Sequence, residues 1–170
     1  ETGLSSVVSK LSPCIWVHVS QPDRFRAAEL LCLYLSEKMR TEFLITYGEE
    51  FTEKPNSLYD FLIIGKVSDQ LSYPNFFKEY DPKVVICLDG PLPYVLTSRI
   101  KQKKHLSIFA DVRSENLPKR KLKILPNFGQ NVLNKFNFVF TEDEMAASQL
   151  SQRSVDEHKI KGIGLLQSAI

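Results

Sequence analysis

The chain has 170 residues, of which 43% are hydrophobic, 11% aromatic and 25% charged. This composition is typical of one packed globular domain and excludes a disordered or fibrous chain. The formal net charge is only +2, so the overall charge points to no class of partner. No apolar run approaches the roughly 20 residues that a transmembrane helix needs, so the sequence predicts no membrane span.

Three cysteines, Cys14, Cys32 and Cys87, make an odd number, and at least two of them lie within apolar runs. We therefore predict buried thiols in a reducing compartment rather than a disulfide framework or a metal cage. We expect no signal peptide before the first apolar run. Residues 1–3 fit a remnant of an expression vector, and we expect a single domain over residues 1–170.

Short apolar runs alternate with amphipathic stretches along the whole chain. The runs are continuous rather than alternating in polarity, which predicts strands covered on both faces. The stretches carry apolar residues at helical spacing, as at Ala28, Leu31 and Leu35. In chain order the patterns predict a strand at 15–18, a helix at 25–38, strands at 43–46, 61–64 (closed by Gly65) and 83–88, a helix at 94–103, a strand at 106–110, a partly helical segment at 122–135, a strand at 138–140, a helix at 142–153 and a strand at 160–163.

This alternation predicts a three-layer α/β Rossmann-like domain with a mostly parallel sheet and right-handed crossovers. In such sheets, ligands bind beyond the carboxyl ends of the strands. Four loops are therefore candidate binding loops, at residues 20–24, 65–69, 89–94 and 111–115.

The first of these loops supports two interpretations. Ser20 followed by Asp23 fits a capping box, and Pro22 fits the first turn of the helix that follows. In that structural interpretation, which the local pattern favours, neither side chain needs a ligand. In the functional interpretation, Asp23 opens into the sheet cleft and accepts a proton from a substrate hydroxyl.

Most other motifs of catalytic and metal-binding sites are absent from the sequence. A lone histidine at the end of an apolar strand, as His18 is, more often forms hydrogen bonds in a core than catalyses a reaction. No two histidines have metal-ligand spacing, and the sequence contains no CxxC or HExxH motif. It also lacks G-x-G-x-x-G, Walker A and G-x-S-x-G motifs, which argues against dehydrogenases, P-loop NTPases and α/β-hydrolases. We therefore expect neither a metal nor a cofactor.

Basic residues gather in one segment of the chain. Residues 99–123 carry nine lysines and arginines but only Asp111 and Glu115, a balance of about +7, so the remainder is about −5. This segment is either a solvated surface or a patch for anionic phosphate, such as a phosphorylated glycolipid or a lipid headgroup. Nucleic acid is the weaker choice, because no aromatic side chains alternate with the basic ones.

The order of the segments resembles the amino-terminal domain of the 3-deoxy-D-manno-octulosonic acid (Kdo) transferases of lipid A glycosylation. Their first strand and turn read W-[IV]-H-x-x-S-x-G-E, and residues 15–23 look like a shorter, altered version. Their P-D-[LV]-x-[LI]-x-x-x-E-x-W-P-N block is similar in outline to residues 81–94. Residues 110–115 resemble N-A-R-x-S-E, residues 135–144 resemble F-D-x-[IV]-x-[AC]-Q-[ST]-E-x-[DE], and residues 160–162 lie where V-x-G-N-x-K ends the domain.

This resemblance implies the acceptor-side half of a two-domain GT-B glycosyltransferase, whose second Rossmann-like domain, in cis or in trans, supplies most nucleotide-sugar contacts. It implies a phosphorylated glycolipid acceptor in lipid A or lipopolysaccharide-type biosynthesis, and a cytoplasmic location that can be peripheral to the inner membrane. Asp23 takes the position of the family's general base. The residues expected to bind the acceptor or another anion are Ser20, Arg24, Asp89, Arg113, Lys119, Arg120 and Lys121.

Several positions depart from the family pattern. Asp23 stands where the family has Glu, which places the carboxylate about one methylene farther back, and Pro22 replaces the preceding glycine. Gly90 takes an acidic position, and Ile163 takes the position of the final Asn. These departures leave a second hypothesis open, a catalytically degenerate domain that acts as a noncatalytic binding or protein-interaction module. A third is that the likeness extends to the fold alone.

Overall fold

The computed structural model describes residues 14–48, 50–67, 80, 82–88, 105–114 and 132–162. All seven predicted strands are present, and the first helix has the predicted bounds. The helix predicted at 94–103 and most of the segment at 122–135 lie outside the described residues. In chain order the elements are β1 (Cys14–Val19), the 3-10 helix η1 (Pro22–Arg24), α1 (Phe25–Lys38), β2 (Glu42–Tyr47), β3 (Leu62–Lys66), β4 (Val84–Leu88), β5 (Leu106–Val112), β6 (Phe138–Thr141), α5 (Glu144–Gln152), η3 (Glu157–Lys159) and β7 (Ile160–Gly162).

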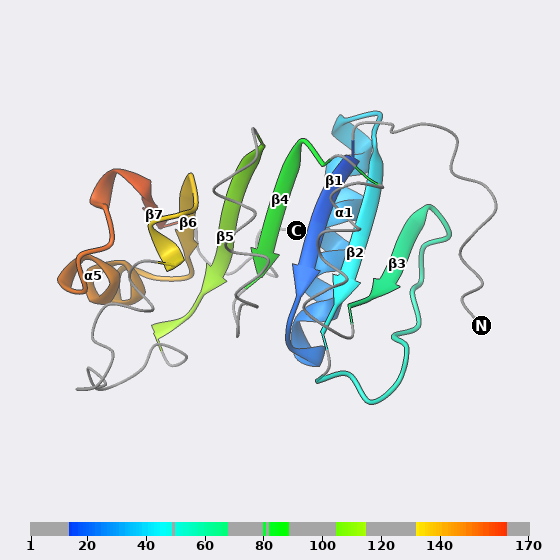
Figure 1. Cartoon of the computed structure of the whole chain (residues 1–170), viewed down its shortest axis with the longest axis horizontal. Coiled ribbons are helices and arrows are strands. Elements are labelled where there is room, and N and C mark those ends of the chain that lie inside the picture. Colours follow the sequence, from blue (N-terminus) through cyan, green and yellow to red (C-terminus); the bar gives the residue numbers. More distant parts are fainter. Residues whose placement is uncertain are drawn as a thin grey trace.

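The strands form one seven-stranded sheet in the order β3-β2-β1-β4-β5-β6-β7, and every pair is parallel (Figure 1). From β1 in the middle of the sheet, the strand order runs outward to β3, returns to place β4 beside β1, and then runs outward to β7. This reversal is the topological switch point of a doubly wound sheet, where ligands bind beyond the strand ends. The predicted α/β Rossmann-like fold is confirmed.

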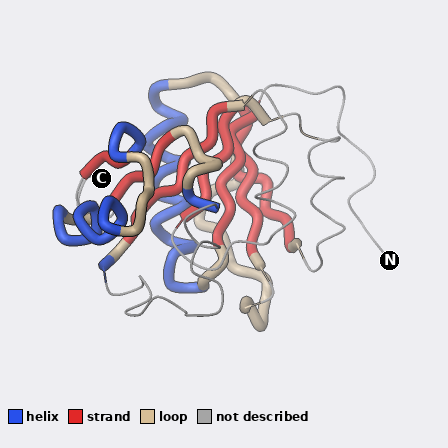
Figure 2. The backbone as a smooth tube through the Cα atoms, turned by 60° about the vertical axis from the view of Figure 1, so that its left-hand side comes forward, coloured by secondary structure: helices blue, strands red, loops and turns tan. Residues whose placement is uncertain are grey.

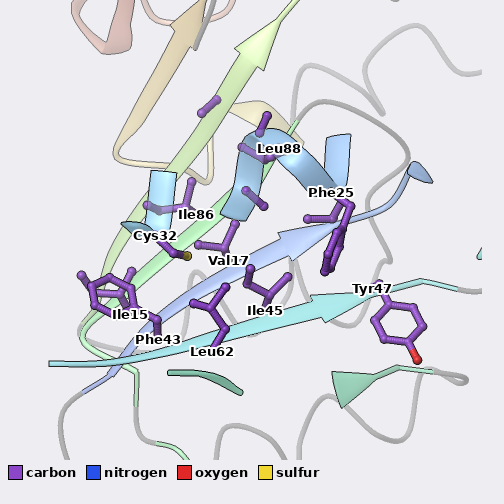
Figure 3. Packing of buried hydrophobic residues seen from close by; sticks show 14 of the residues in the cluster. Ile15, Val17, Phe25, Cys32, Phe43, Ile45, Tyr47, Leu62, Ile86 and Leu88 are labelled. Carbon is purple, nitrogen blue, oxygen red and sulfur yellow. The ribbon is translucent and has the colours of Figure 1, made fainter. Parts of the chain in front are cut away.

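Each face of the sheet has its own hydrophobic core. One core contains Ile15 and Val17 of β1 together with Ala28 and Cys32 of α1, so α1 covers this face (Figure 3). The other contains Trp16 of β1 together with apolar residues of α5. Because successive side chains of a strand point to opposite faces, the continuous apolar runs serve both cores at once. The sheet twists between these two layers, as Figure 2 shows from a second direction.

The described residues between β2 and β3, 48 and 50–61, contain no helix, and this segment is tied to α1 by a buried carboxylate. Glu29 is 2% exposed, and its Oε1 accepts hydrogen bonds from Ser57 Oγ at 2.7 Å and from the Leu58 amide at 3.1 Å. Its other oxygen accepts a hydrogen bond from Arg26 Nη1 at 3.0 Å. The Arg26 guanidinium also stacks 5.5 Å from the centre of the Tyr59 ring. Glu29 therefore holds the segment against the first turns of α1.

No helix among the described residues is both long enough and apolar enough to cross a bilayer.

Replacing Glu29 with Ala should release the segment between β2 and β3. The change removes the acceptor of the Leu58 amide and the nearer of two acceptors of the Ser57 hydroxyl, which costs about 1–3 kcal/mol of unfolding free energy. Glu29→Gln keeps an acceptor oxygen and should cost less. Urea unfolding and amide hydrogen exchange at Leu58 measure both effects, and an Ala variant with unchanged stability and unchanged Leu58 exchange would contradict this account.

Candidate functional site

The turn after β1 leads from the centre of the sheet into α1 and lies at the switch point. Val19 is the last residue of β1, η1 covers Pro22–Arg24, and α1 begins at Phe25. The Arg24 amide donates to the Gln21 carbonyl at 3.1 Å and closes the single 3-10 turn. Pro22 lies at the start of this turn, as predicted.

The capping box predicted for Ser20 and Asp23 is wrong. Gln21 is the N-cap of η1 and Arg24 is the N-cap of α1, and neither position has a side-chain capping hydrogen bond. Ser20 comes too early to cap, because it continues the alternation of β1 and turns toward the sheet. It is 5% exposed, and its Oγ lies 3.4 Å from His18 Nε2. The Asp23 side chain is 65% exposed, so its carboxylate is accessible from solvent.

A buried ion pair crosses the carboxyl edge of the sheet. Arg24 Nη1 donates to Asp111 Oδ2 at 2.7 Å, and each of the two residues is 1% exposed. Arg24 follows β1 and Asp111 lies in β5, with β4 between these strands in the sheet. The Arg24 side chain therefore joins two turns that are 87 residues apart in the sequence.

Asp111 occupies an unusual backbone position. Its φ angle is 61°, in the left-handed region that few residues other than glycine adopt, although Asp tolerates it better than most. The register between β5 and β6 shifts between Phe109 and Val112, so Asp111 lies in an irregularity of the strand. Such strain at a strand end is typical of functional sites and needs strong local contacts to persist. The ion pair with Arg24 is such a contact.

Further charges extend this pair along the edge in an alternating row. Asp23 Oδ2 lies 3.7 Å from Arg24 Nε on one side. On the other side, Arg113 Nη2 lies 3.7 Å from Asp111 Oδ2, and Arg113 Nε lies 3.0 Å from Glu142 Oε2. We call Asp23, Arg24, Asp111, Arg113 and Glu142 the charged rim. The turn after β1 and the ends of β5 and β6 all contribute to it.

The rim brings together three of the residues predicted from sequence, Asp23, Arg24 and Arg113. Asp89, Lys119, Arg120 and Lys121 lie outside the described residues, so their assignment to anion binding stays a prediction. Asp111 belongs to the binding loop predicted at 111–115 but lies within β5, and neither it nor Glu142 was assigned a role of its own from sequence. A charged residue directly after a buried apolar run, as Asp111 follows Ala110, was the available signal.

On the face opposite α1, a polar network lies beside the rim. Thr46 Oγ1 accepts a hydrogen bond from Trp16 Nε1 at 2.7 Å and lies 2.9 Å from His18 Nδ1. His18 is fully buried, and this desolvation lowers its pKa to about 4. The imidazole is therefore neutral at physiological pH, and the prediction of a hydrogen-bonded core histidine is confirmed.

The cysteines do not contribute to the rim. Cys14, Cys32 and Cys87 are all free and buried, as predicted. Burial, together with the nearby Glu29 carboxylate, raises the pKa of Cys32 to about 12, and burial also raises the pKa of Cys87. Both thiols therefore stay protonated and are poor nucleophiles. Within the described ranges, no three His, Cys, Asp or Glu side chains are arranged to hold a metal ion.

A groove of about 540 Å³ opens next to the turn that carries Asp23. The start of α1 forms one wall and residues 51–58 form the other. Its lining is mostly apolar but includes charged side chains at Arg26, Glu53 and Lys54. Pro22, the neighbour of Asp23, belongs to this lining, so the groove and the rim share one turn of the chain.

Neither a protein-family model nor a curated protein sequence matches the chain significantly. Solved structures do match it over most of its length. A UDP-GlcNAc 2-epimerase from Rickettsia bellii superposes with a TM-score of 0.60 at 10% identity, over 93% of this chain and 46% of that one. The corresponding enzyme from Methanocaldococcus jannaschii gives 0.54 at 17% identity, over 90% and 45% of the two chains. Anabaena Alr3699/HepE, solved with UDP and glucose, gives 0.54 at 11% identity, over 89% and 44%.

The chain has a GT-B-like Rossmann fold. At these identities the likeness shows the fold alone, and the chain spans less than half the length of each of these proteins. The family resemblance seen in the sequence is thus supported at the level of the GT-B-like domain.

The buried neutral His18 should make stability depend on pH. Its pKa is about 4 in the folded chain and 6.5 when unfolded, so the unfolded chain binds the extra proton between these values. The contribution of His18 to the unfolding free energy should therefore be fully present above pH 6.5. It should fall by roughly 3 kcal/mol as the pH drops toward 4. His18→Gln removes the titration, so the difference in pH slope between the two proteins measures it. Parallel slopes would contradict the assignment.

Breaking the buried ion pair from one side should be costly. Arg24→Met separates the buried Asp111 carboxylate from its nearest cation, at a cost of about 3–5 kcal/mol of unfolding free energy. Adding Asp111→Asn removes the buried negative charge and should recover part of the loss. Arg40→Met, at an exposed position, is the control and should change stability by less than about 0.5 kcal/mol. Additive losses in the double variant, measured by urea unfolding, would show that the two residues are not coupled.

Proposed function

We propose that this chain is the acceptor-side half of a Kdo-transferase-like glycosyltransferase and that Asp23 deprotonates the acceptor hydroxyl. The observation that carries the proposal is the position of Asp23. Its side chain is 65% exposed, and its turn begins at the carboxyl end of β1, beside the switch point of the sheet. This is where a doubly wound sheet binds its ligands.

The likeness to sugar-nucleotide proteins supports this choice of reaction class. The similar structures are named as UDP-GlcNAc 2-epimerases and as a protein in complex with UDP and glucose. The sequence blocks around residues 15–23 and 110–115, which resemble those of Kdo transferases, narrow the proposal to transfer onto a lipid A-type acceptor. A second Rossmann-like domain, in cis or in trans, would hold the activated sugar.

In the proposed reaction, a carboxylate oxygen of Asp23 accepts the proton of the acceptor hydroxyl. The freed oxygen attacks the anomeric carbon of the sugar, and the bond from that carbon to the nucleotide breaks. A general base must come within about 2.6–3.2 Å of the hydroxyl oxygen to act in this way. Because Asp23 is on the surface of the turn, the acceptor can approach it without a change in the fold.

The groove and the basic segment support a phosphorylated glycolipid as the acceptor. The apolar lining of the groove, next to Pro22, suits the hydrocarbon part of such a molecule. Lys119, Arg120 and Lys121, together with Arg113, would hold its phosphates or the anionic membrane surface. Asp89 would complete the acceptor side, whereas Ser20, predicted to join it, is buried beside His18. This arrangement suits an enzyme that works peripherally on the cytoplasmic face of a membrane.

The alternative is a noncatalytic binding or protein-interaction module with the same scaffold. The rim favours it in one respect, because the arginines at Arg24 and Arg113 are already paired with carboxylates. The shorter Asp23 side chain, where the family has Glu, favours it in another. Activity of the complete natural polypeptide separates the two functions.

Asp23→Asn should abolish sugar transfer by the complete natural polypeptide. The amide cannot accept the proton, whereas Asp23→Glu restores the carboxylate with the longer reach of the family and should keep or raise turnover. The assay is transfer from nucleotide-activated Kdo, and from UDP-sugars, to a lipid A precursor. Asp60→Asn, at an exposed turn before β3, is the matched control and should behave as the wild type.

The Asn substitution should leave the fold intact, because Asp23 is exposed and makes no capping hydrogen bond. We therefore expect its unfolding free energy to stay within about 0.5 kcal/mol of wild type. A folded Asn variant with wild-type turnover would exclude Asp23 as the base. No transfer by the wild type with any of these donors would favour the binding module.

The basic segment should bind anionic membranes in a salt-dependent way. Replacing Lys119, Arg120 and Lys121 with Ala should weaken binding to phosphatidylglycerol vesicles by roughly 1 kcal/mol per charge removed. Binding should also fall as the ionic strength rises, because salt screens exposed charges. Vesicle sedimentation measures both effects, and binding that does not change with salt would argue against this role.

A further inference from the structure

We infer that Arg24 is a positioning residue, held by Asp111 beneath the turn after β1, that orients the Asp23 carboxylate toward a neutral hydroxyl group of the acceptor. This inference rests on the proposed function, because it concerns the group that Asp23 would deprotonate. It gives Arg24 a role other than the anion binding that the sequence predicted.

Arg24 is anchored in the fold and shielded from solvent. It is 1% exposed, and its Nη1 donates to the equally buried Asp111 carboxylate at 2.7 Å. A phosphate of an acceptor could reach this guanidinium only by displacing Asp111, which would separate a buried carboxylate from its nearest cation. Removing one partner from such a pair is strongly unfavourable. The side chain is thus built into the fold and is not available to a dissolved anion.

A second donor of the guanidinium is its Nε–H group. Arg24 Nε is buried and makes no hydrogen bond, which is uncommon for a buried donor. The anionic oxygen paired with it is Asp23 Oδ2, at 3.7 Å. The Asp23 side chain is mostly exposed, so a small rotation can bring this oxygen into hydrogen-bond range. Arg24 Nε then holds one oxygen of Asp23 and leaves the other oxygen to accept a proton.

The ion pair between Arg24 and Asp111 also fixes the backbone of the turn. Neither η1 nor α1 has a side-chain N-cap, so the Arg24 anchor replaces the usual means of holding a helix start. Asp23 immediately precedes the anchored residue. Its carboxylate faces solvent next to a cation that is already neutralised by Asp111. A neutral hydroxyl suits this position better than a phosphate, because the exposed charge is negative.

The first test measures the contact without turnover, in the 170-residue chain. Nitrogen-15 NMR resolves arginine Nε–H signals, and we expect the Arg24 signal to exchange slowly with water and to shift in both Asp23→Asn and Asp111→Asn. Asp60→Asn should leave it in place. An Arg24 signal that exchanges as fast as that of exposed Arg40 and does not respond to Asp23→Asn would overturn the inference.

The second test measures the catalytic consequence in the complete natural polypeptide, with the donors and lipid A precursor named above. Arg24→Lys keeps the charge opposite Asp111 but cannot reach both carboxylates with a planar fork. We expect a loss in kcat of about 10- to 100-fold with KM changed by less than about threefold, and Arg40→Lys should be unchanged. A folded Arg24→Lys enzyme with wild-type kcat would overturn the inference.

The two tests separate this inference from the proposed function. If Asp23→Asn stops transfer while Arg24→Lys does not slow it, Asp23 is the base and Arg24 does not position it. If the Arg24 Nε–H signal responds to Asp23 but Asp23→Asn keeps full turnover, the contact exists and the proposed base is wrong, which also overturns the catalytic role of Arg24. Because Asp111→Asn can weaken the fold, only variants with a wild-type-like circular dichroism spectrum are compared.

Discussion

The buried ion pair between Arg24 and Asp111 determines how the carboxyl edge of this sheet is built. Removing two charges from water costs several kcal/mol for each ion, so such a pair persists only when its geometry is close and its setting is rigid. Both conditions are met here, since the two atoms are 2.7 Å apart and both residues are 1% exposed. The pair passes the end of β4 and connects the turn after β1 with the end of β5. It thereby fixes which side chains of the edge stay buried and which, like Asp23, remain exposed.

Successive side chains of β1 point to opposite faces of the sheet, and this alternation continues into the turn. Its odd-numbered residues, such as Val17, pack against α1, whereas Trp16 and His18 on the other face share the hydroxyl of Thr46. Ser20 continues the second series and is buried beside His18. The chain then leaves the sheet in a single 3-10 turn, which brings Arg24 inward and Asp23 outward. Arg24 is therefore buried while its neighbour Asp23, the candidate base, is exposed.

Much of the fold could be predicted from the sequence, because it depends on local pattern. Seven strands and two helices followed from continuous apolar runs and helical spacing, and burial of the three cysteines followed from their place in those runs. The end of β3 was placed too early, since Gly65 ends the apolar run but still pairs with Thr46 in the ladder. A glycine weakens a strand without necessarily ending it. The predicted architecture was correct because strands that alternate with helices along the chain form a parallel sheet.

The site was harder to predict, because its contacts join distant parts of the chain. Ser20 and Asp23 have the spacing of a capping box, but that spacing assumes that the helix begins directly after Ser20, and η1 intervenes. The partner of Arg24 lies 87 residues away, in a strand irregularity with a left-handed residue, which no local pattern reports. The prediction that Asp23 and Arg113 approach the same edge came from the general rule for parallel sheets. This rule predicts at which edge of the sheet the residues lie, but not the order of the charges along that edge.

The central claim is that the exposed carboxylate of Asp23, beside an anchored arginine, is where an acceptor hydroxyl loses its proton. The most direct measurement is a crystal structure of the complete natural polypeptide with a lipid A precursor bound. The account predicts an acceptor hydroxyl oxygen within about 2.6–3.2 Å of an Asp23 oxygen, with Arg24 still paired with Asp111. An acceptor bound at the amino ends of the strands, or with its phosphate in place of Asp111 on Arg24, would contradict it.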